Sequence, residues 1–267
     1  MKLKEEKIKE AVKEGYAKIA TQQECCCGGS NLSQEIGYSE DELKSVPQSA
    51  DLGLGCGNPV ALASLKKGET VVDLGSGGGI DCFLAANKVG EKGKVIGIDM
   101  TPEMISRATE TARKNDYKNV EFRLGEIEKM PVEGDTANVI ISNCVINLSP
   151  NKAKVFKEAF RVLKPGGRLM ISDIVLLKQL PEPIKRSVEA YVGCLAGAIM
   201  KNEYMTLIRD AGFRKEEVIE ETHFPIEYMI NDPTAKAIAK KSKISQSELA
   251  EIAHSVASVK VYAEKPQ

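Results

Sequence analysis

The sequence has no tryptophan, only two histidines and 5% aromatic residues, and its charges are almost balanced. With 37 basic and 38 acidic residues, it lacks the basic excess of a nucleic-acid-binding protein. The nearest candidate for a membrane span, Ala190–Met200, is too short and contains two glycines. The N-terminus alternates lysine and glutamate and has no apolar core of a secretory signal. We therefore expect a cytoplasmic protein with no membrane and no nucleic-acid partner.

Cysteine, in contrast, is abundant for a chain of this composition. There are seven: Cys25, Cys26, Cys27, Cys56, Cys82, Cys144 and Cys194. The number is odd and no Cys-x-x-Cys pair occurs, so the spacing indicates neither a disulfide framework nor a zinc site. In a reducing cytoplasm we expect all seven to be thiols.

The middle of the chain alternates short apolar strands with helices. Strands are predicted over 71–74, 94–99, 120–124, 138–143 and 168–173, and helices over 79–89, 101–115 and 149–163. Thr101-Pro102 and Ser149-Pro150 each offer a polar cap followed by proline at the first helical position, and 164–167 is expected to be a turn. Continuous apolar strands of this kind indicate a parallel sheet covered on both faces.

The two ends of the chain are less regular. Residues 1–21 have the spacing of an amphipathic helix, and residues 22–65 form an irregular stretch that holds four cysteines and is a candidate lid. Beyond the fifth strand we predict helices over 181–200, 203–211 and 225–256, and strands over 217–221 and 259–263.

A glycine-rich loop, Asp73–Gly79, connects the first strand to its helix. Its glycines permit a tight turn and let a ligand approach the backbone at the carboxyl edge of the sheet. Asp99 ends the next strand 20 residues after Gly79, where a carboxylate can accept hydrogen bonds from both hydroxyls of a ribose. Together these features predict a site for an adenosine-containing cofactor.

The loop resembles the first motif of class I S-adenosylmethionine-dependent methyltransferases. It opens with an acid, which suits the ammonium group of a methionine better than the pyrophosphate of a dinucleotide. Gly97–Met100, Gly125-Glu126 and Leu163–Gly167 match further motifs of that superfamily, although Asn138 replaces its usual aspartate, a change that we interpret as structural.

This resemblance implies an α/β fold with a doubly wound, Rossmann-like sheet of seven strands, and S-adenosyl-L-methionine as cofactor. Met100 is expected against the adenine, with ordinary core packing as an equal alternative. The residues implied at the cofactor are Asp73, Gly75, Ser76, Gly77, Asp99, Met100, Glu126, Ile127 and Asn143.

Three cysteines lie in separate motifs around this core. Ser142–Leu148 puts Cys144 at the carboxyl end of the fourth strand, where a carbon or oxygen methyltransferase would need a general base. Cys194 is expected in the inserted helix, and Cys56 lies in the loop Gly53–Pro59. Thiols from three elements suit a soft, three-coordinate centre such as trivalent arsenic.

On the Gly-Cys-Gly-Asn-Pro, Ser-Asn-Cys-Val-Ile-Asn-Leu and Gly-Cys-Leu-Ala-Gly-Ala motifs, the sequence is similar to arsenite methyltransferases from about Cys26 to Pro266. The similarity implies that Cys144 and Cys194 hold As(III), with Cys56 as a third ligand or a resolving thiol. It also implies a disulfide partner for Cys56 among the N-terminal cysteines. Cys26 and Cys27 are preferred, but a redox role and an incidental one are equally open for that run.

The implied substrate is arsenite or its thiol adduct, and the implied reductant is glutathione or a thioredoxin-like protein. On this interpretation residues 1–66 form an N-terminal helix and Cys-rich lid segment, 67–175 the cofactor-binding core, and 176–267 a helical arsenic-binding insertion with the last strands.

Two other functions remain open. A carbon or oxygen methyltransferase acting on a quinone or sterol predicts a wide apolar pocket, which the low aromatic content disfavours. A non-catalytic, thiol-based arsenic-binding protein predicts binding without turnover. Cys82 is interpreted as a buried hydrophobe, and His223 and His254 as surface residues.

Overall fold

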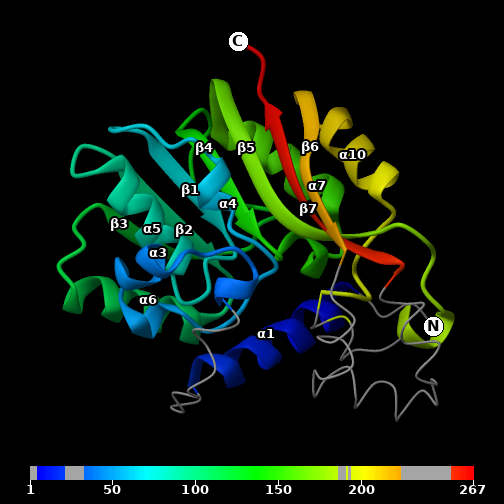
Figure 1. Cartoon of the computed structure of the whole chain (residues 1–267), viewed down its shortest axis with the longest axis horizontal. Coiled ribbons are helices and arrows are strands. Elements are labelled where there is room, and N and C mark those ends of the chain that lie inside the picture. The colour runs from blue at the N-terminus through cyan, green and yellow to red at the C-terminus, as the bar shows by residue number, and fades with distance from the viewer. Residues whose placement is uncertain (1–4, 22–32, 186–190, 192–193, 224–253) are drawn as a thin grey trace.

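The computed structural model describes residues 5–21, 33–185, 191, 194–223 and 254–267, and its centre is a seven-stranded sheet (Figure 1). The strand order is β3-β2-β1-β4-β5-β7-β6. The strands are β1 (Thr70–Leu74), β2 (Lys94–Asp99), β3 (Val120–Leu124), β4 (Ala137–Asn143), β5 (Leu163–Leu176), β6 (Arg214–His223) and β7 (Val256–Glu264).

The first five strands are parallel, whereas β7 pairs antiparallel with both β5 and β6. The predicted seven-stranded, doubly wound sheet is therefore confirmed, with an antiparallel pair at one edge. The strand order reverses between β1 and β4, and in open α/β sheets a ligand crevice forms at such a reversal, outside the carboxyl ends of the strands.

Helices cover both faces of the sheet. They are α1 (Glu5–Thr21), α3 (Glu40–Lys44), α4 (Pro59–Leu62), α5 (Ile80–Val89), α6 (Pro102–Lys114), α7 (Lys152–Val162), α8 (Glu182–Lys185) and α10 (Lys201–Asp210), with 3₁₀ turns over Gln48–Ala50 and Ile146–Leu148. Because neighbouring strand residues face opposite sides, Val71 packs with Phe83 of α5, and Val72 with Phe156 of α7. The amphipathic helix predicted at the N-terminus is confirmed as α1, which lies below the carboxyl edge of the sheet in Figure 1.

Two predictions for the α7 region are wrong. The helix cap is Asn151, whose side chain accepts a hydrogen bond from the Lys154 amide at 3.1 Å, while the Ser149 hydroxyl donates to Glu128 instead. The expected turn over 164–167 belongs to β5, because the backbone of Gly166 and Gly167 exchanges hydrogen bonds with Lys265.

The predicted helix over 181–200 is wrong for its C-terminal part. Glu182–Lys185 (α8) and Tyr191 are helical, but Cys194 lies in a turn and none of residues 194–200 is helical. Most of the predicted helical region 225–256 lies outside the described residues. The structural interpretation of Asn138 is confirmed, since its Oδ1 accepts hydrogen bonds from the Thr70 amide at 2.9 Å and from Lys164.

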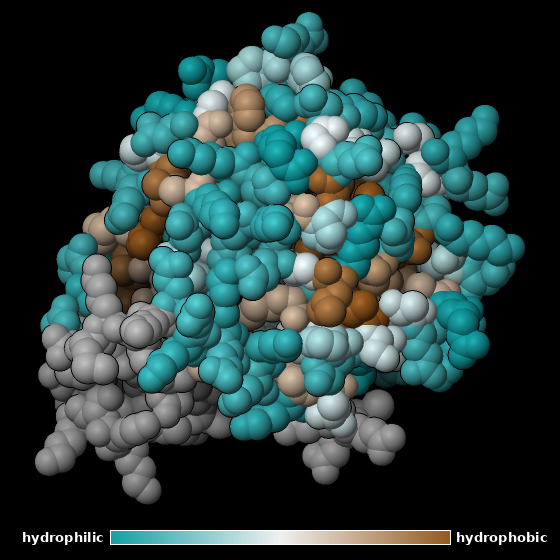
Figure 2. Space-filling view, turned by 180° about the vertical axis from the view of Figure 1, so that it is seen from behind, coloured by the Kyte–Doolittle hydropathy of each residue, from teal (hydrophilic) through white to brown (hydrophobic). Residues whose placement is uncertain are grey.

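Figure 2 shows a face covered mainly by hydrophilic residues, with small, separate hydrophobic patches between them. Leu124 and Ile219 are the exposed large hydrophobic residues of the described chain, and single apolar residues of this kind are ordinary on protein surfaces. None of the described helices is both long enough and apolar enough to cross a membrane.

Candidate active site

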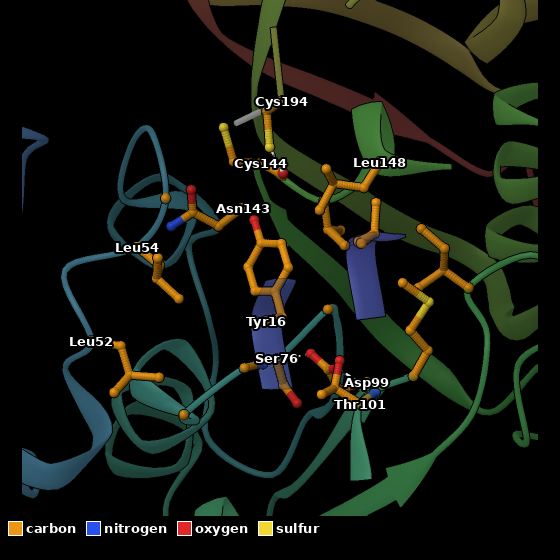
Figure 3. Close-up of a pocket in the computed structure, with 18 of the residues that line it drawn as sticks. Tyr16, Leu52, Leu54, Ser76, Asp99, Thr101, Asn143, Cys144, Leu148 and Cys194 are labelled. Carbon is orange, nitrogen blue, oxygen red and sulfur yellow. Dashed lines mark hydrogen bonds between the residues drawn. The ribbon is translucent and has the colours of Figure 1, made fainter. Parts of the chain in front are cut away.

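A cavity of about 400 Å³ lies at the carboxyl edge of the sheet, between the glycine loop and two cysteines (Figure 3). Gly75, Ser76 and Asp99 line one part of it, and Cys144 and Cys194 line another. Val12, Tyr16 and Ile19 of α1 also face it, so this helix forms part of the wall. The volume is within the range of small-molecule sites.

Asp99 holds the glycine loop in shape. Its carboxylate accepts hydrogen bonds from the Gly77 amide at 3.0 Å and from the Thr101 amide at 2.8 Å. Burial raises the pKa of this carboxyl, whereas hydrogen bonds with Thr101, Gly77 and the Met100 amide lower it. Asp99 lines the cavity, so its carboxylate is placed where the ribose hydroxyls expected from the sequence can meet it.

Gly75 brings the glycine loop against the turn that carries Cys144. Its backbone is left-handed, with φ of 65°, and a Cβ atom built there would lie 2.3 Å from a Val145 methyl group. Only glycine fits without displacing Val145. The cofactor loop and the Cys144 turn are therefore in direct contact.

Seven of the nine residues expected at the cofactor line the cavity: Gly75, Ser76, Gly77, Asp99, Met100, Ile127 and Asn143. The Ser76 hydroxyl is buried and has no hydrogen-bond partner within the described part of the chain, as expected of a group that meets a ligand. These groups, together with Asp99, fit an adenosine-containing cofactor.

Asp73 and Glu126 do not line the cavity. Asp73 is buried behind the loop and accepts a hydrogen bond from the Cys82 thiol at 3.2 Å. Cys82 is thus buried as expected, and it also has a polar contact. Glu126 is half exposed and forms an ion pair with Lys9 of α1 at 2.7 Å.

The acid that does line the cavity is Asp81, which the sequence analysis did not select. It lies in the first turn of α5 and accepts hydrogen bonds from the Tyr38 hydroxyl at 2.9 Å and from the Asn143 amide at 3.2 Å. Burial raises the pKa of Asp81 to about 6. Its position at the start of a helix that follows a glycine loop was a usable indication.

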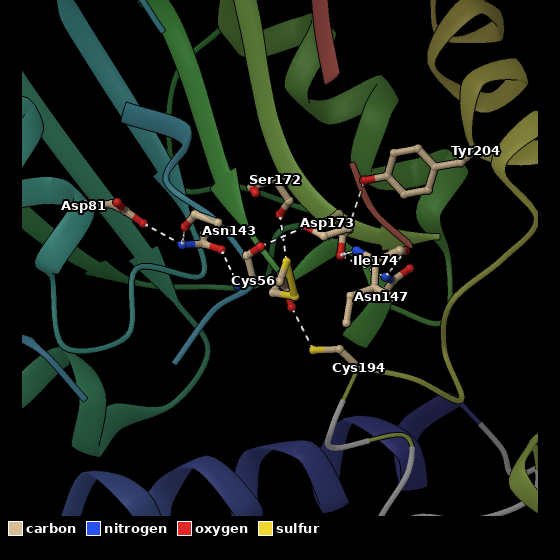
Figure 4. The surroundings of a disulfide bond; sticks show 12 residues. Cys56, Asp81, Asn143, Asn147, Ser172, Asp173, Ile174, Cys194 and Tyr204 are labelled. Carbon is tan, nitrogen blue, oxygen red and sulfur yellow. Dashed lines mark hydrogen bonds between the residues drawn. A yellow bond between two sulfur atoms is a disulfide. The ribbon is translucent and has the colours of Figure 1, made fainter. Parts of the chain in front are cut away.

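Cys56 and Cys144 form a disulfide whose Cα atoms are 5.8 Å apart (Figure 4). The expectation that all cysteines are thiols is therefore wrong for this pair. The two residues are 88 positions apart in sequence, and they meet because the Cys56 loop packs across the end of β4. Cys56 is buried and does not line the cavity.

Asn143 fixes the Cys56 loop against β4. Its Oδ1 accepts a hydrogen bond from the Cys56 amide at 3.0 Å, and its Nδ2 donates to the Gly57 carbonyl at 2.7 Å. Asn143 lines the cavity as expected, but its amide is already bonded to this loop and to Asp81.

Cys144 and Cys194 both have left-handed backbones, with φ of 56° and 63°. Residues other than glycine and asparagine rarely adopt this conformation. The Cys194 thiol donates to the Cys144 carbonyl at 2.9 Å, so the two cysteines that line the cavity are neighbours.

Burial, followed by the charge of Asp173, raises the pKa of the Cys194 thiol to about 12. A hydrogen bond with the Tyr16 hydroxyl acts in the opposite direction and lowers that pKa. Tyr16 comes from α1, and its ring points toward the two cysteines in Figure 3. No local pattern in the sequence distinguishes it from any other tyrosine of an amphipathic helix.

Asp173, on β5, is the third residue that the sequence analysis missed. One of its carboxylate oxygens and the sulfur atoms of Cys56 and Cys144 all lie within 4.8 Å of one another. Burial raises the pKa of this carboxyl to about 6. An acid near the carboxyl end of a central strand was visible in the sequence. Cys26 and Cys27, the expected redox partners of Cys56, lie outside the described residues.

The fold and the glycine loop agree with a family match. Residues 65–212, more than half of the chain, match the family model described as "Methyltransferase domain". The chain belongs to this methyltransferase family. An arsenite methyltransferase of Halobacterium salinarum is 48% identical to this chain over 230 residues, which are 80% of this chain and 59% of that protein.

An arsenite methyltransferase of Aquipseudomonas alcaligenes is 36% identical over 81% of this chain and 61% of its own length. The chain thus spans about three fifths of these curated relatives. The crystal structure of an arsenic(III) S-adenosylmethionine methyltransferase from Chlamydomonas reinhardtii superposes with a TM-score of 0.63 at 30% identity, covering 88% of this chain and 73% of that chain. The resemblance to arsenite methyltransferases is confirmed.

Proposed function

We propose that this chain transfers a methyl group from S-adenosylmethionine to trivalent arsenic held by cysteine thiolates. One observation carries the proposal: the cavity that Gly75 and Asp99 line also contains Cys144 and Cys194. The similarity to the arsenite methyltransferases described above supports the same acceptor.

In this function the glycine-loop side of the cavity binds the methyl donor. Asp99 would accept hydrogen bonds from the ribose hydroxyls, the Ser76 hydroxyl would form a hydrogen bond with the ligand, and Met100 and Ile127 would border the adenine. Bound there, S-adenosylmethionine would supply an electrophilic methyl group. Asp81 provides a negative charge on the same side, near the start of α5.

Cys144 and Cys194 act on the acceptor side. Soft thiolates bind soft arsenic, and two fixed sulfur atoms orient its lone pair and exclude water from it. Accepting a methyl cation takes arsenic from the trivalent to the pentavalent state. The Cys56 thiol then attacks the sulfur of the arsenic-bound Cys144. The Cys56–Cys144 disulfide forms, the bond between arsenic and the Cys144 sulfur breaks, and its electron pair returns arsenic to the trivalent state. The Cys56 proton leaves to solvent, and the methylated arsenic stays on Cys194. Glutathione or a thioredoxin-like protein then reduces that disulfide.

The test is arsenic speciation by mass spectrometry after incubating the full chain with As(III), S-adenosylmethionine and a thiol. We expect methylated arsenic from the wild type and none from Cys144→Ser or Cys194→Ser. Cys82→Ala is the matched control, because Cys82 is an equally buried cysteine that does not line the cavity. A Cys144→Ser variant that methylates at the wild-type rate would contradict the proposal.

The same assay separates the other functions. Arsenic that stays bound to the protein without methylation would indicate a non-catalytic binding protein. If the protein neither binds nor methylates arsenic, that result would indicate a carbon or oxygen acceptor. The matches to arsenite methyltransferases do not favour such an acceptor.

A further inference from the structure

Asp173 lies between the cysteines and Tyr204 in Figure 4 and is completely buried. Its carboxylate, Cys56 and Cys144 form a group of two sulfur atoms and one oxygen within 4.8 Å of one another. Its charge also acts on the thiol of Cys194. Asp173 is thus an acid close to all three candidate arsenic thiols, and the mechanism described above does not use it.

The hydrogen bonds of Asp173 are unevenly distributed between its two oxygens. Oδ1 accepts from the Asn147 amide at 2.8 Å and from the Ile174 amide at 2.9 Å. Oδ2 accepts from the Tyr204 hydroxyl at 2.9 Å, its one hydrogen-bond donor among the residues that the structure describes. Because a carboxylate has about four acceptor positions, one position on Oδ2 is left for a donor.

Arsenite brings such a donor. When arsenous acid condenses with two thiols, two As–S bonds form, two As–O bonds break, and the two hydroxyls leave with the thiol protons as water. The product keeps one As–OH group. The Cys144 sulfur lies within 4.8 Å of a carboxylate oxygen of Asp173. If Cys144 is one of the two thiolates, arsenic is bonded to this sulfur, and the hydroxyl on that arsenic is close to the carboxylate.

We propose that Asp173 accepts a hydrogen bond from the hydroxyl that arsenite retains after two cysteines have bound it, and so selects inorganic arsenite over its methylated product. The inference rests on the proposed function for its substrate class. Methylarsonous acid bound to the same two thiolates has a methyl group in place of the hydroxyl. It offers Asp173 no donor, so the first methylation is favoured over the second.

The test is equilibrium binding of arsenite and of methylarsonous acid to the reduced full chain, without S-adenosylmethionine, measured by dialysis and elemental mass spectrometry. A hydrogen bond to a charged group corresponds to about tenfold or more in affinity. We expect Asp173→Asn to weaken arsenite binding by this factor and to leave methylarsonous acid binding almost unchanged. A purely structural role would weaken both equally, and that result would overturn the proposal.

Tyr204→Phe is the matched control, since it removes one donor to Asp173 and keeps the carboxylate. It should leave the ratio of the two affinities within about twofold of the wild-type value. If Asp173→Asn does not fold, the wild-type ratio is compared with that of dithiothreitol, which binds arsenic through two thiols alone. Equal ratios would refute the selection. Binding with the expected ratio but without methylation would overturn the proposed function and leave this inference standing.

Discussion

The amide of Asn143 should control how readily the Cys56–Cys144 disulfide forms. The substitution Asn143→Ala removes the acceptor for the Cys56 amide and the donor to the Gly57 carbonyl. Cys56 and Gly57 are both buried, so water cannot replace these two bonds without opening the loop.

The expected cost follows from these two orphaned backbone groups. A buried backbone group left without a partner costs about 1–3 kcal/mol, and the lower half of that range applies because the bonds are only partly buried. We therefore expect Asn143→Ala to lower the free energy of unfolding by about 2–4 kcal/mol. The Cys56 loop should also become less ordered, so that its thiol meets Cys144 less often.

Asn119→Ala is the matched control. The Nδ2 of Asn119 also donates to two backbone carbonyls, those of Ala86 and Gly90. Asn119 lies before the amino end of the edge strand β3, whereas Asn143 lies at the carboxyl end of β4, and Asn119 is not fully buried. Its cost should be about 1 kcal/mol, with no effect on the disulfide.

The assay combines urea unfolding of each variant with the rate at which the reduced protein regains the Cys56–Cys144 disulfide in a defined glutathione buffer. Asn143→Ala should re-form it at least about fivefold more slowly than Asn119→Ala, given a loop destabilised by 1 kcal/mol or more. Equal stability and equal rates for the two variants would refute the role that we assign to Asn143.

Three further predictions follow from single contacts. Arg168→Lys should lower the free energy of unfolding, measured with urea, by about 1–3 kcal/mol. Lysine cannot keep both the bidentate ion pair with Glu69 and the hydrogen bonds to two loop carbonyls. An unchanged free energy of unfolding would contradict this. Tyr16→Phe should raise the pKa of Cys194 further and slow its alkylation at pH 8, and unchanged alkylation would contradict the role of the hydroxyl. Burial raises the pKa of Asp81 to about 6, so its carboxyl supports folding at low pH, and this support is lost as the pH rises from about 4 through 6. The stability of wild type relative to Asp81→Asn, measured from pH 4 to 7, should therefore fall by up to about 3 kcal/mol, and a flat difference would refute the assignment.

The sheet and the cofactor loop could be predicted because their determinants are local. Each parallel strand is a short apolar run between polar segments, and the loop of Asp73–Gly79 contains the glycines that its left-handed backbone needs. The carboxyl edge of a parallel sheet then places Cys144 near that loop without further information.

The remainder of the site depends on long-range packing. Tyr16 reaches the cavity because α1 lies at the carboxyl edge of the sheet. Asp81 rather than Asp73 is in the wall, because Asp73 is buried behind the loop against the Cys82 thiol. The Cys194 segment was expected to belong to a helix over 181–200. Its left-handed turn depends instead on close packing, since a Cβ on Gly197 would lie 2.1 Å from the Asn147 carbonyl.

The left-handed backbones of Cys144 and Cys194 link this packing to the chemistry. Such a conformation costs on the order of 1 kcal/mol for each residue and persists only where neighbouring contacts enforce it. At Cys144 those contacts are the hydrogen bond from its amide to the Ser172 carbonyl, at 2.8 Å, and the packing of Val145 on Gly75. At Cys194 they are two hydrogen bonds, one from its amide to the Tyr191 carbonyl and one from its thiol to the Cys144 carbonyl. A soft centre bound by two thiolates needs both sulfur atoms in position before it arrives, since each side chain ordered on binding would weaken the affinity. In the function proposed above, this small, local cost at two cysteines would arrange the acceptor side of the cavity before the substrate enters, once the Cys56–Cys144 disulfide is reduced.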